Sequence, residues 1–330
     1  MNDTLTVRLG IVGTGMISEA HAAALKVVPE IQLAGITDIN PAAAEGFARK
    51  WGTDPYPSYD ALLEAVDAVI LCTPNDLHEP MAKQALAAGK HLLIEKPMAL
   101  SGAGAESIRQ GYADAGLALM VGHTHRHADY ARAVRQTIDD GLVGDVRSVR
   151  IAITGGWIWA GWQAWVLDPT RSGGHAFHNG VHLYDLACWW TGSRAARVYA
   201  VGQQLTSAAL DIDDYLCATL MMESGATAVC EISRGERPKQ VNAFEIVVHG
   251  TDATLVRRWD SDGLVVFNDD AAGPRPAPVT DNFARQLRVF AAAINGGDAY
   301  PSPAAAVHAT AIAEAVERSA RGQRVEEVTL

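Results

Sequence analysis

The residue with the clearest chemical potential is a lysine that follows a buried-looking run of apolar residues. Glu95-Lys96-Pro97 comes directly after the run His91–Ile94, and Thr73-Pro74-Asn75 follows another run that ends at Cys72. We predict that both runs are strands whose carboxyl ends lie at one edge of a parallel sheet, where open α/β sheets bind their ligands. A lysine followed by proline at such a position is hard to explain by packing, so Lys96 is a candidate for contact with a ligand.

A second candidate lies in the segment His178-Asn179-Gly180-Val181-His182. Imidazole titrates near neutral pH, which suits a side chain that accepts a proton. If the segment is helical, the spacing of four places His178 and His182 on one face. The alternative is that His182 is a core histidine on an apolar helix face.

A glycine-rich turn is the candidate phosphate site. Gly10-Ile11-Val12-Gly13-Thr14-Gly15-Met16-Ile17-Ser18 joins the first apolar run to a helical pattern. Gly13 permits a tight turn, and Gly15 lets a pyrophosphate approach the helix N-terminus. Ser18 replaces the third glycine of the dinucleotide fingerprint and is still small. The alternative, that the glycines only form a turn, fits less well with the strand–turn–helix context.

The next apolar run ends at an acidic residue that bears on the choice of cofactor. Asp38 lies about 20 residues after Gly15, where an acid can bind the ribose hydroxyls. Its carboxylate would repel a 2′-phosphate, and Ile39-Asn40-Pro41 supplies no Lys or Arg to hold one. We therefore predict NAD rather than NADP. Alternatively, Asp38 caps the helix that begins near Pro41.

The pattern of elements changes near residue 122. Before it, short apolar runs alternate with helical patterns, which predicts an α/β fold, a doubly wound Rossmann domain. After it, successive alternating runs predict an α+β domain with a mostly antiparallel open sheet. The Pro- and Gly-rich sequence from Ala271 to Pro278 is predicted to be a loop. We expect a Rossmann domain at 1–122 and a substrate and oligomerisation domain at 123–330, with the C-terminal helices able to pack back on the first domain.

These motifs, in this order, resemble those of the glucose–fructose oxidoreductase / inositol dehydrogenase / MocA family. The resemblance rests on the glycine turn, Glu95-Lys96-Pro97, Ser172-Gly173-Gly174 and Gly180-Val181-His182-Leu183-Tyr184-Asp185, and it covers nearly the whole chain. It implies hydride transfer between a nicotinamide and a carbinol carbon, commonly of a sugar or cyclic polyol. It also implies that Lys96 hydrogen-bonds the reacting oxygen, that His182 accepts the hydroxyl proton, and that a cis peptide often precedes Pro97.

The resemblance extends to the residues that we expect to bind ligands. The residues expected to contact substrate are His125, Arg126, Trp165, His178 and Asn179. The residues expected to bind the cofactor are Gly13, Gly15, Met16, Ile17, Asp38, Thr73, Pro74, Asn75, His78, Glu95 and Lys96.

The sequence departs from the family at two positions. Many relatives carry Asp where this chain has His178, so a carboxylate that could orient His182 is missing. The Arg often found after the family's tryptophan is Val166 here, which argues against a phosphorylated substrate. The proton path and the substrate are therefore open.

Two further clusters invite a functional interpretation. His123, His125 and His127 alternate, so an extended chain would point all three the same way, and His175 lies near His178 and His182. A metal site is conceivable, but hydrogen bonds to sugar hydroxyls explain the histidines as well, and we expect no metal. Four tryptophans, Trp157, Trp159, Trp162 and Trp165, suit either a carbohydrate pocket or core and interface packing.

Composition narrows the classes of partner. A net charge of -11 argues against nucleic acid, and no apolar run approaches the roughly 20 residues of a membrane span. Four widely spaced cysteines and the lack of a signal sequence favour the cytoplasm. We expect an NAD-dependent dehydrogenase of a sugar, glycoside or inositol-like polyol that forms a homodimer or homotetramer. The alternatives are a dehydrogenase of a cyclic dihydrodiol and a non-catalytic NAD-binding regulator.

Overall fold

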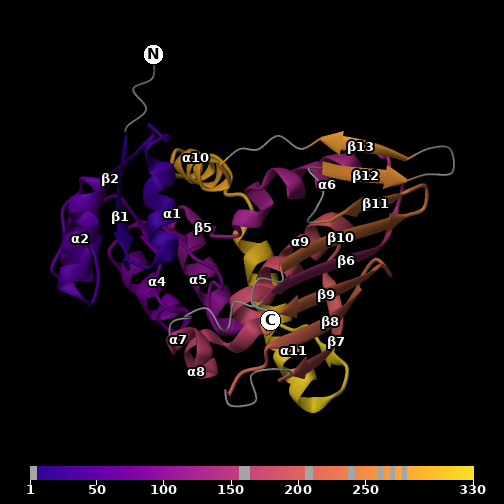
Figure 1. Ribbon diagram of the computed structural model, residues 1–330. Coiled ribbons are helices and arrows are strands. Elements are labelled where there is room, and N and C mark those ends of the chain that lie inside the picture. The colour runs from indigo at the N-terminus through magenta and orange to yellow at the C-terminus, as the bar shows by residue number, and fades with distance from the viewer. Residues whose placement is uncertain are drawn as a thin grey trace. The chain divides into compact units, whose positions relative to one another are not determined.

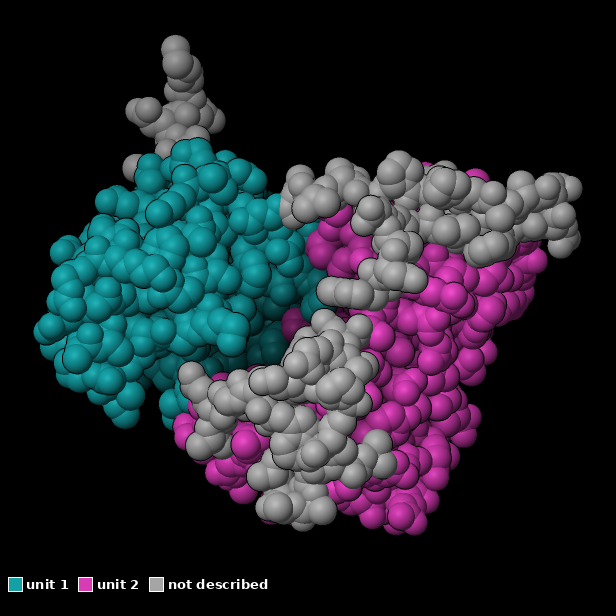
Figure 2. Space-filling model, in the orientation of Figure 1, with its two compact units in different colours: residues 1–99, 103–127, 281–307 teal, residues 100–102, 128–280, 308–330 magenta. Residues whose placement is uncertain are grey.

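The computed structural model describes residues 6–155, 164–204, 211–236, 242–258, 263–267, 272–276 and 281–330. Its elements form two compact units that are discontinuous in sequence (Figures 1 and 2). The first unit comprises residues 1–99, 103–127 and 281–307, and the second comprises residues 100–102, 128–280 and 308–330. The boundary between functional domains expected at residue 122 stays a prediction. Among the described residues, no helix is both long and apolar enough to cross a membrane.

The first unit is built on a five-stranded parallel sheet in the order β2-β1-β3-β4-β5. Its strands are β1 (Val7–Val12), β2 (Ile31–Thr37), β3 (Ala68–Leu71), β4 (His91–Ile94) and β5 (Leu119–Val121). Its helices are α1 (Met16–Leu25), α2 (Pro41–Trp51), α3 (Tyr59–Ala65), α4 (His78–Ala87), α5 (Gly102–Ala115) and α10 (Asn282–Ile294), with short 3-10 turns η1 (Asn75–Leu77) and η2 (Thr124–His127).

Helices cover both faces of this sheet, so successive strand residues pack into different cores. On β3, Ile70 belongs to a core shared with α1 and α10, whereas Val69 and Leu71 belong to a core shared with α4 and α5. Strands that are buried on both faces have continuous runs of apolar residues in their sequence. The predicted doubly wound Rossmann arrangement is confirmed.

The second unit is built on a nine-stranded sheet in the order β13-β12-β11-β10-β6-β9-β8-β7-β14. All neighbours are antiparallel except β6 and β9, so the predicted mostly antiparallel sheet is confirmed. Its strands are β6 (Val146–Gly155), β7 (Ala195–Gln203), β8 (Tyr215–Met222), β9 (Thr227–Ser233), β10 (Asn242–Gly250), β11 (Thr254–Arg257), β12 (Gly263–Phe267), β13 (Ala272–Pro276) and β14 (Glu326–Glu327). Its helices are α6 (Asp129–Asp139), α7 (Ala164–Leu167), α8 (Pro169–Ser172), the π-helix η4 (Ala176–Gly180), α9 (Val181–Thr191) and most of α11 (Pro303–Gly322).

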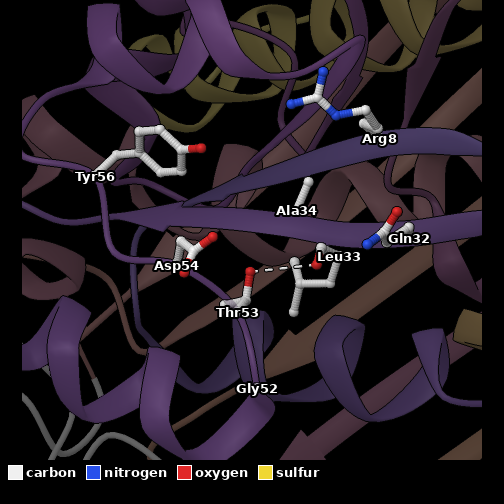
Figure 3. Close-up of a pocket in the computed structure, with 8 residues that line it drawn as sticks. All are labelled: Arg8, Gln32, Leu33, Ala34, Gly52, Thr53, Asp54 and Tyr56. Atoms are coloured by element: carbon white, nitrogen blue, oxygen red, sulfur yellow. Dashed lines mark hydrogen bonds between the residues drawn. The ribbon is translucent and has the colours of Figure 1, made fainter.

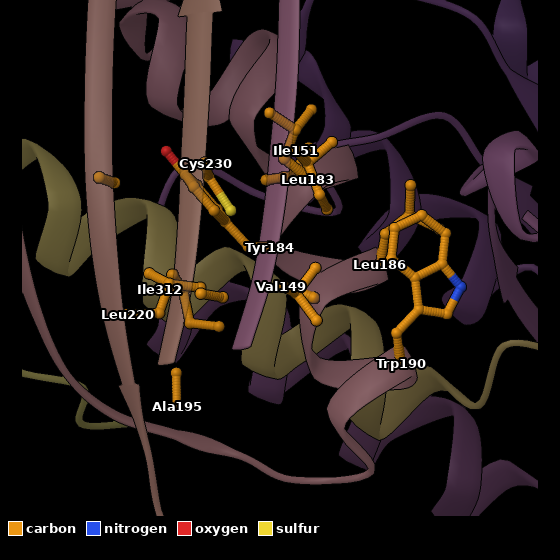
Figure 4. Close-up of a cluster of buried hydrophobic side chains, with 14 of the residues drawn as sticks. Val149, Ile151, Leu183, Tyr184, Leu186, Trp190, Ala195, Leu220, Cys230 and Ile312 are labelled. Carbon is orange, nitrogen blue, oxygen red and sulfur yellow. The ribbon is translucent and has the colours of Figure 1, made fainter. Parts of the chain in front are cut away.

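One face of the nine-stranded sheet packs against helices α9 and α11. Figure 4 shows this core, in which Trp190 of α9 and Ile312 of α11 lie among strand residues such as Val149. Trp190 is fully buried, and its indole N–H donates to the carbonyl of Ala131 at 3.2 Å. The core therefore fixes α9, the helix that carries His182.

Two local predictions are wrong. The segment predicted as a loop contains β13, which pairs with β12 alone in the described sheet. An edge strand tolerates prolines because its outer N–H groups need no ladder partner, so Pro274 and Pro276 fit there. The segment with alternating histidines is not extended: after His123 the chain turns into the 3-10 helix η2, in which the Arg126 N–H bonds to the His123 carbonyl at 3.0 Å.

Candidate active site

The glycine turn lies between β1 and α1, at the carboxyl edge of the first unit's sheet. Gly13 has φ of +98°, and a Cβ there would come within 2.7 Å of the Cys72 carbonyl oxygen. Only glycine therefore allows the turn to lie against the end of β3. At Gly15 a Cβ would meet no atom within 4 Å, and no side chain caps the N-terminus of α1. Free space before uncapped helical N–H groups fits the pyrophosphate of a dinucleotide.

Asp38 directly follows β2 and accepts hydrogen bonds from Thr14 of the same turn. One carboxylate oxygen accepts from both the backbone N–H and the hydroxyl of Thr14, each at 2.8 Å, and the other accepts from the Asn40 N–H at 2.8 Å. The N-cap of α2 is Asn40, whose side chain accepts from Ala42 and Ala43. The alternative that Asp38 caps this helix is therefore wrong. The half-buried carboxylate is held beside the turn, where it fits a ribose diol.

A buried histidine contacts the segments that follow β3 and β4, which carry the Thr73-Pro74-Asn75 and Glu95-Lys96-Pro97 motifs. The His78 ring is fully buried, with Nδ1 2.6 Å from the Pro97 carbonyl oxygen and Nε2 3.0 Å from the Thr73 carbonyl oxygen. Burial lowers the pKa of His78, although the two carbonyls and Glu95 favour its protonation. Through these two contacts, the ring connects the segment after β3 to the segment after β4. A direct contact between His78 and a cofactor stays a prediction.

Lys96 follows Glu95 at the end of β4. Its side chain is half-buried, and its peptide bond to Pro97 is cis, as the resemblance implies. Glu95 is 6% exposed and lies with one carboxylate oxygen 2.8 Å from Nε2 of His21 on α1. Burial opposes ionisation of Glu95, but the hydrogen bond with His21 and the nearby Lys96 and His78 hold its pKa below the ordinary value. The edge thus carries a buried carboxylate directly before the lysine.

The histidines of η2 do not form one row. His123 and His127 are buried, and His125 is half-buried. Arg126 is also buried, with its guanidinium 5.8 Å from the ring centre of Tyr300. Among the residues that the structure describes, no group of three or more His, Cys, Asp or Glu side chains could hold a metal ion.

The second unit presents its own group of predicted residues. His178 and Asn179 lie in the π-helix η4, and His182 lies in the first turn of α9, which follows directly. The rings of Trp165 and His178 meet edge to face, with centres 5.5 Å apart. Single-turn π-helices such as η4 recur at functional sites, because the extra residue in the turn changes the direction in which side chains project. The three other tryptophans of the cluster, Trp157, Trp159 and Trp162, lie outside the described residues.

Around Asn179 of η4 lies a buried polar cluster that the sequence did not reveal. Asn179 contacts Nδ1 of His175 at 2.9 Å and accepts from the Arg234 guanidinium at 2.8 Å. Burial, with the charge of Arg234, lowers the pKa of His175 to about 3, so its ring is neutral at pH 7. Burial also lowers the pKa of Arg234 to about 9. Asn179 is thus fixed by two partners, and a substrate contact from it stays a prediction.

A small surface hollow in the first unit is separate from this edge. It is lined by Arg8, Gln32, Leu33, Ala34, Gly52, Thr53, Asp54 and Tyr56 (Figure 3). Arg8 and Gln32 lie near the amino ends of β1 and β2, opposite the carboxyl ends at which α/β sheets bind ligands. The hollow is therefore not part of the candidate site.

Two sequence profiles of one family together span most of the chain. Residues 7–123 match the profile described as an oxidoreductase family with an NAD-binding Rossmann fold. Residues 131–256 match the profile of the Gfo/Idh/MocA C-terminal domain. The chain belongs to the Gfo/Idh/MocA oxidoreductase family. Its first unit is accordingly an NAD-binding Rossmann domain, as predicted.

Other members of the Gfo/Idh/MocA family are similar to this chain over most of their length. An inositol 2-dehydrogenase of Rhizobium meliloti (strain 1021) is 28% identical, over 97% of this chain and 98% of that protein. A levoglucosan dehydrogenase of Pseudarthrobacter phenanthrenivorans is 24% identical, over 82% of this chain and 78% of that protein. The crystal structure of an oxidoreductase domain protein from Kribbella flavida gives a TM-score of 0.89 at 27% identity, over 98% of this chain and 100% of that chain.

Two residues of this Gfo/Idh/MocA chain were missed by the sequence reasoning. His21 lies in an Ala-rich helical pattern and contacts Glu95, and Arg234 follows the last residue of β9 and contacts Asn179. A polar residue at an otherwise apolar helix position is the signal that marks His21. Arg234 carries no comparable signal, because an arginine after a strand is ordinary on a surface.

Proposed function

We propose that this chain is an NAD-dependent dehydrogenase that transfers hydride between nicotinamide and a hydroxyl-bearing carbon of a sugar, glycoside or inositol-like polyol. The observation that carries the proposal is the carboxyl edge of the first sheet, where the open helix N-terminus, Asp38 and Lys96 follow the parallel strands β1, β2 and β4. The relatives named for inositol and levoglucosan support the substrate class. The same proposal includes a homodimer or homotetramer in the cytoplasm, which size-exclusion chromatography and fractionation test.

The proposed roles follow from the chemistry of the side chains. Bound NAD supplies the acceptor for the hydride. In the oxidative direction, His182 takes the proton of the substrate hydroxyl as a general base. Lys96 donates a hydrogen bond to the same oxygen, which stabilises the negative charge that develops there. His125, Arg126, Trp165, His178 and Asn179 are proposed to hold the remaining hydroxyls and ring faces of the substrate.

A spectrophotometric screen tests this proposal directly. Reduction of NAD and NADP is followed at 340 nm over sugars, glycosides, inositols and dihydrodiols, with and without a chelator. Chelator-insensitive turnover of a sugar or polyol with NAD is the expected result. Turnover of a dihydrodiol alone would reassign the substrate class. Binding of NAD without turnover of any compound would contradict the dehydrogenase and favour a regulator.

Asp38 is proposed to select NAD over NADP. In Asp38→Asn, the preference for NAD, taken as the ratio of kcat/KM values, should fall by about tenfold or more, because the charge that repels a 2′-phosphate is gone. Steady-state kinetics with both cofactors measure the ratio. Thr14→Val is the matched control, since it removes a hydrogen bond to Asp38 but keeps the charge. Thr14→Val should weaken the binding of NAD and NADP to the same extent. Unchanged discrimination in Asp38→Asn would show that this carboxylate only anchors the turn.

A further inference from the structure

His21 and Glu95 form a buried contact between two elements of the candidate site. His21 lies on α1, whose N-terminus faces the glycine turn, and its side chain is fully buried. Glu95 follows β4, and its side chain is 7% exposed. The Nε2 and Oε1 atoms are 2.8 Å apart, and the ring of Phe283 from α10 packs edge to face on His21 at 5.1 Å between centres. Water is thus largely excluded from the contact.

The chain makes space for this carboxylate. A Cβ at Gly122, directly after β5, would come within 2.9 Å of all three atoms of the Glu95 carboxylate group. The charged or titratable neighbours that act on Glu95 are His21, Lys96 and His78. Burial is the main cause that raises the pKa of the Cys72 thiol, and the charge of Glu95 raises it further. A buried carboxylate of this kind needs charge partners and hydrogen bonds, because desolvation alone strongly disfavours it.

The contacts of His21 indicate which group carries the charge. Nδ1 of His21 is buried, and no described residue offers it a hydrogen bond. A neutral ring with its proton on Nε2 donates to Glu95 and leaves no buried N–H group unsatisfied. A protonated ring would bury a second N–H without an acceptor, which costs free energy. The pair therefore carries one negative charge on Glu95, beside Lys96 and His78.

We propose that His21 and Glu95 are positioning residues that hold Lys96 as an ammonium group, with Glu95 supplying the charge and His21 fixing the carboxylate. This inference deepens the proposed function and rests on the role given there to Lys96. The backbone N–H of Lys96 also donates to the second Glu95 oxygen at 3.4 Å, so the carboxylate contacts both the backbone of the lysine and His21 on α1. The pair connects the helix behind the dinucleotide turn to the lysine that acts on substrate.

Glu95→Gln tests the charge while keeping the shape of the side chain. We expect kcat to fall about thirtyfold and the alkaline limb of its pH profile to move about one pH unit lower, because an opposite charge favours the ammonium form. Fluorescence titration with NAD measures any loss of cofactor affinity separately from the fall in kcat, because Glu95 is also among the residues expected to bind the cofactor. Glu19→Gln is the matched control on α1, where the carboxylate bonds Lys50 and Trp51 instead. It should leave the pH profile unchanged.

Two substitutions at His21 separate positioning from packing. His21→Gln retains an N–H donor that can reach Glu95, so we expect kcat within about fivefold of wild type. His21→Phe retains the ring against Phe283 but loses the donor, so its kcat and pH profile should resemble those of Glu95→Gln. Equal kinetics for the two His21 variants would overturn the role given to the hydrogen bond. Thermal unfolding of each variant shows whether a loss of activity is a loss of fold.

A titration of Lys96 itself needs no substrate. The chain has six lysines, so reductive methylation with a ¹³C label gives a simple NMR spectrum in which Lys96→Arg identifies the Lys96 signal. Its titration midpoint should lie about one pH unit lower in Glu95→Gln than in wild type. Equal midpoints would overturn the inference, whether or not the variants fold less stably. Wild-type protein that turns over no compound of the screen contradicts the proposed function, and the titration still decides the role of Glu95.

Discussion

Replacing Lys96 by alanine is expected to lower kcat about a thousandfold while the affinity for NAD stays nearly unchanged. The ammonium group is proposed to meet the reacting oxygen, and loss of one preorganised donor to a developing negative charge commonly costs a factor of 10² to 10³ or slightly more. The turn and Asp38, which are proposed to hold the dinucleotide, do not depend on this side chain. Turnover at 340 nm and fluorescence titration with NAD measure the two quantities separately.

The control for Lys96→Ala is a lysine of the same unit with no proposed role. Lys83 is half-exposed on α4 and pairs with Glu79 one helical turn away at 2.6 Å. Exposed pairs of this kind contribute little to stability, so Lys83→Ala should retain full turnover. Near-normal turnover in Lys96→Ala would remove the lysine from the mechanism and, with it, the reason for the buried Glu95 to act on kcat.

Replacing His182 by alanine is expected to lower kcat/KM by about 10³ near neutral pH, because the substrate hydroxyl loses its general base. The residual rate should rise with pH without the acid limb of the wild-type profile, since hydroxide is then the remaining base. The measurement is a pH profile of kcat/KM at saturating NAD. The variant should fold, because His182 is half-buried in the first turn of α9, whereas Trp190 and its neighbours provide the core contacts.

His249 provides the comparison for this second variant. It is exposed on β10, and its Nδ1 atom lies 3.2 Å from the Thr254 hydroxyl. His249→Ala should therefore leave both the rate and its pH dependence unchanged. A His182→Ala profile that keeps its acid limb would show that another group takes the proton, and His178, at the position where the family resemblance implies an aspartate, would be the next residue to test.

Much of the first unit could be predicted because its signals are local. The apolar runs, the glycine turn and the proline at the start of α2 each determine structure within a few residues. The second helix between β2 and β3 was harder to predict, because α3 is only seven residues long and begins at a serine cap rather than at a proline. In the second unit, β13 was missed because its two prolines are typical of loops, and only its edge position explains them.

Residues of the candidate site could be predicted only where the residue type and its position at the end of a strand are enough to suggest a role. Lys96 and Asp38 meet this condition, since the end of a parallel strand fixes their place. The contact of Glu95 with His21 spans 74 positions, and that of Arg234 with Asn179 spans 55 positions. Such pairs depend on how helices pack on a sheet. The residues that neighbour each partner in the sequence do not indicate this packing. The extended histidine row was wrong for the same reason, because the chain turns after β5 to pack on Tyr300.

The discontinuity of the first unit has a consequence for the order of biosynthesis. Helix α10 completes the core on one face of the parallel sheet through Leu287 and Phe290, and Phe283 covers His21. A ribosome adding about 5–20 residues per second reaches this helix on the order of 10–30 s after residue 127. Until then the nascent Rossmann unit keeps an apolar face uncovered. A fragment that ends at residue 127 should therefore bind chaperones and aggregate, whereas adding the segment 281–307 in trans should restore a folded unit.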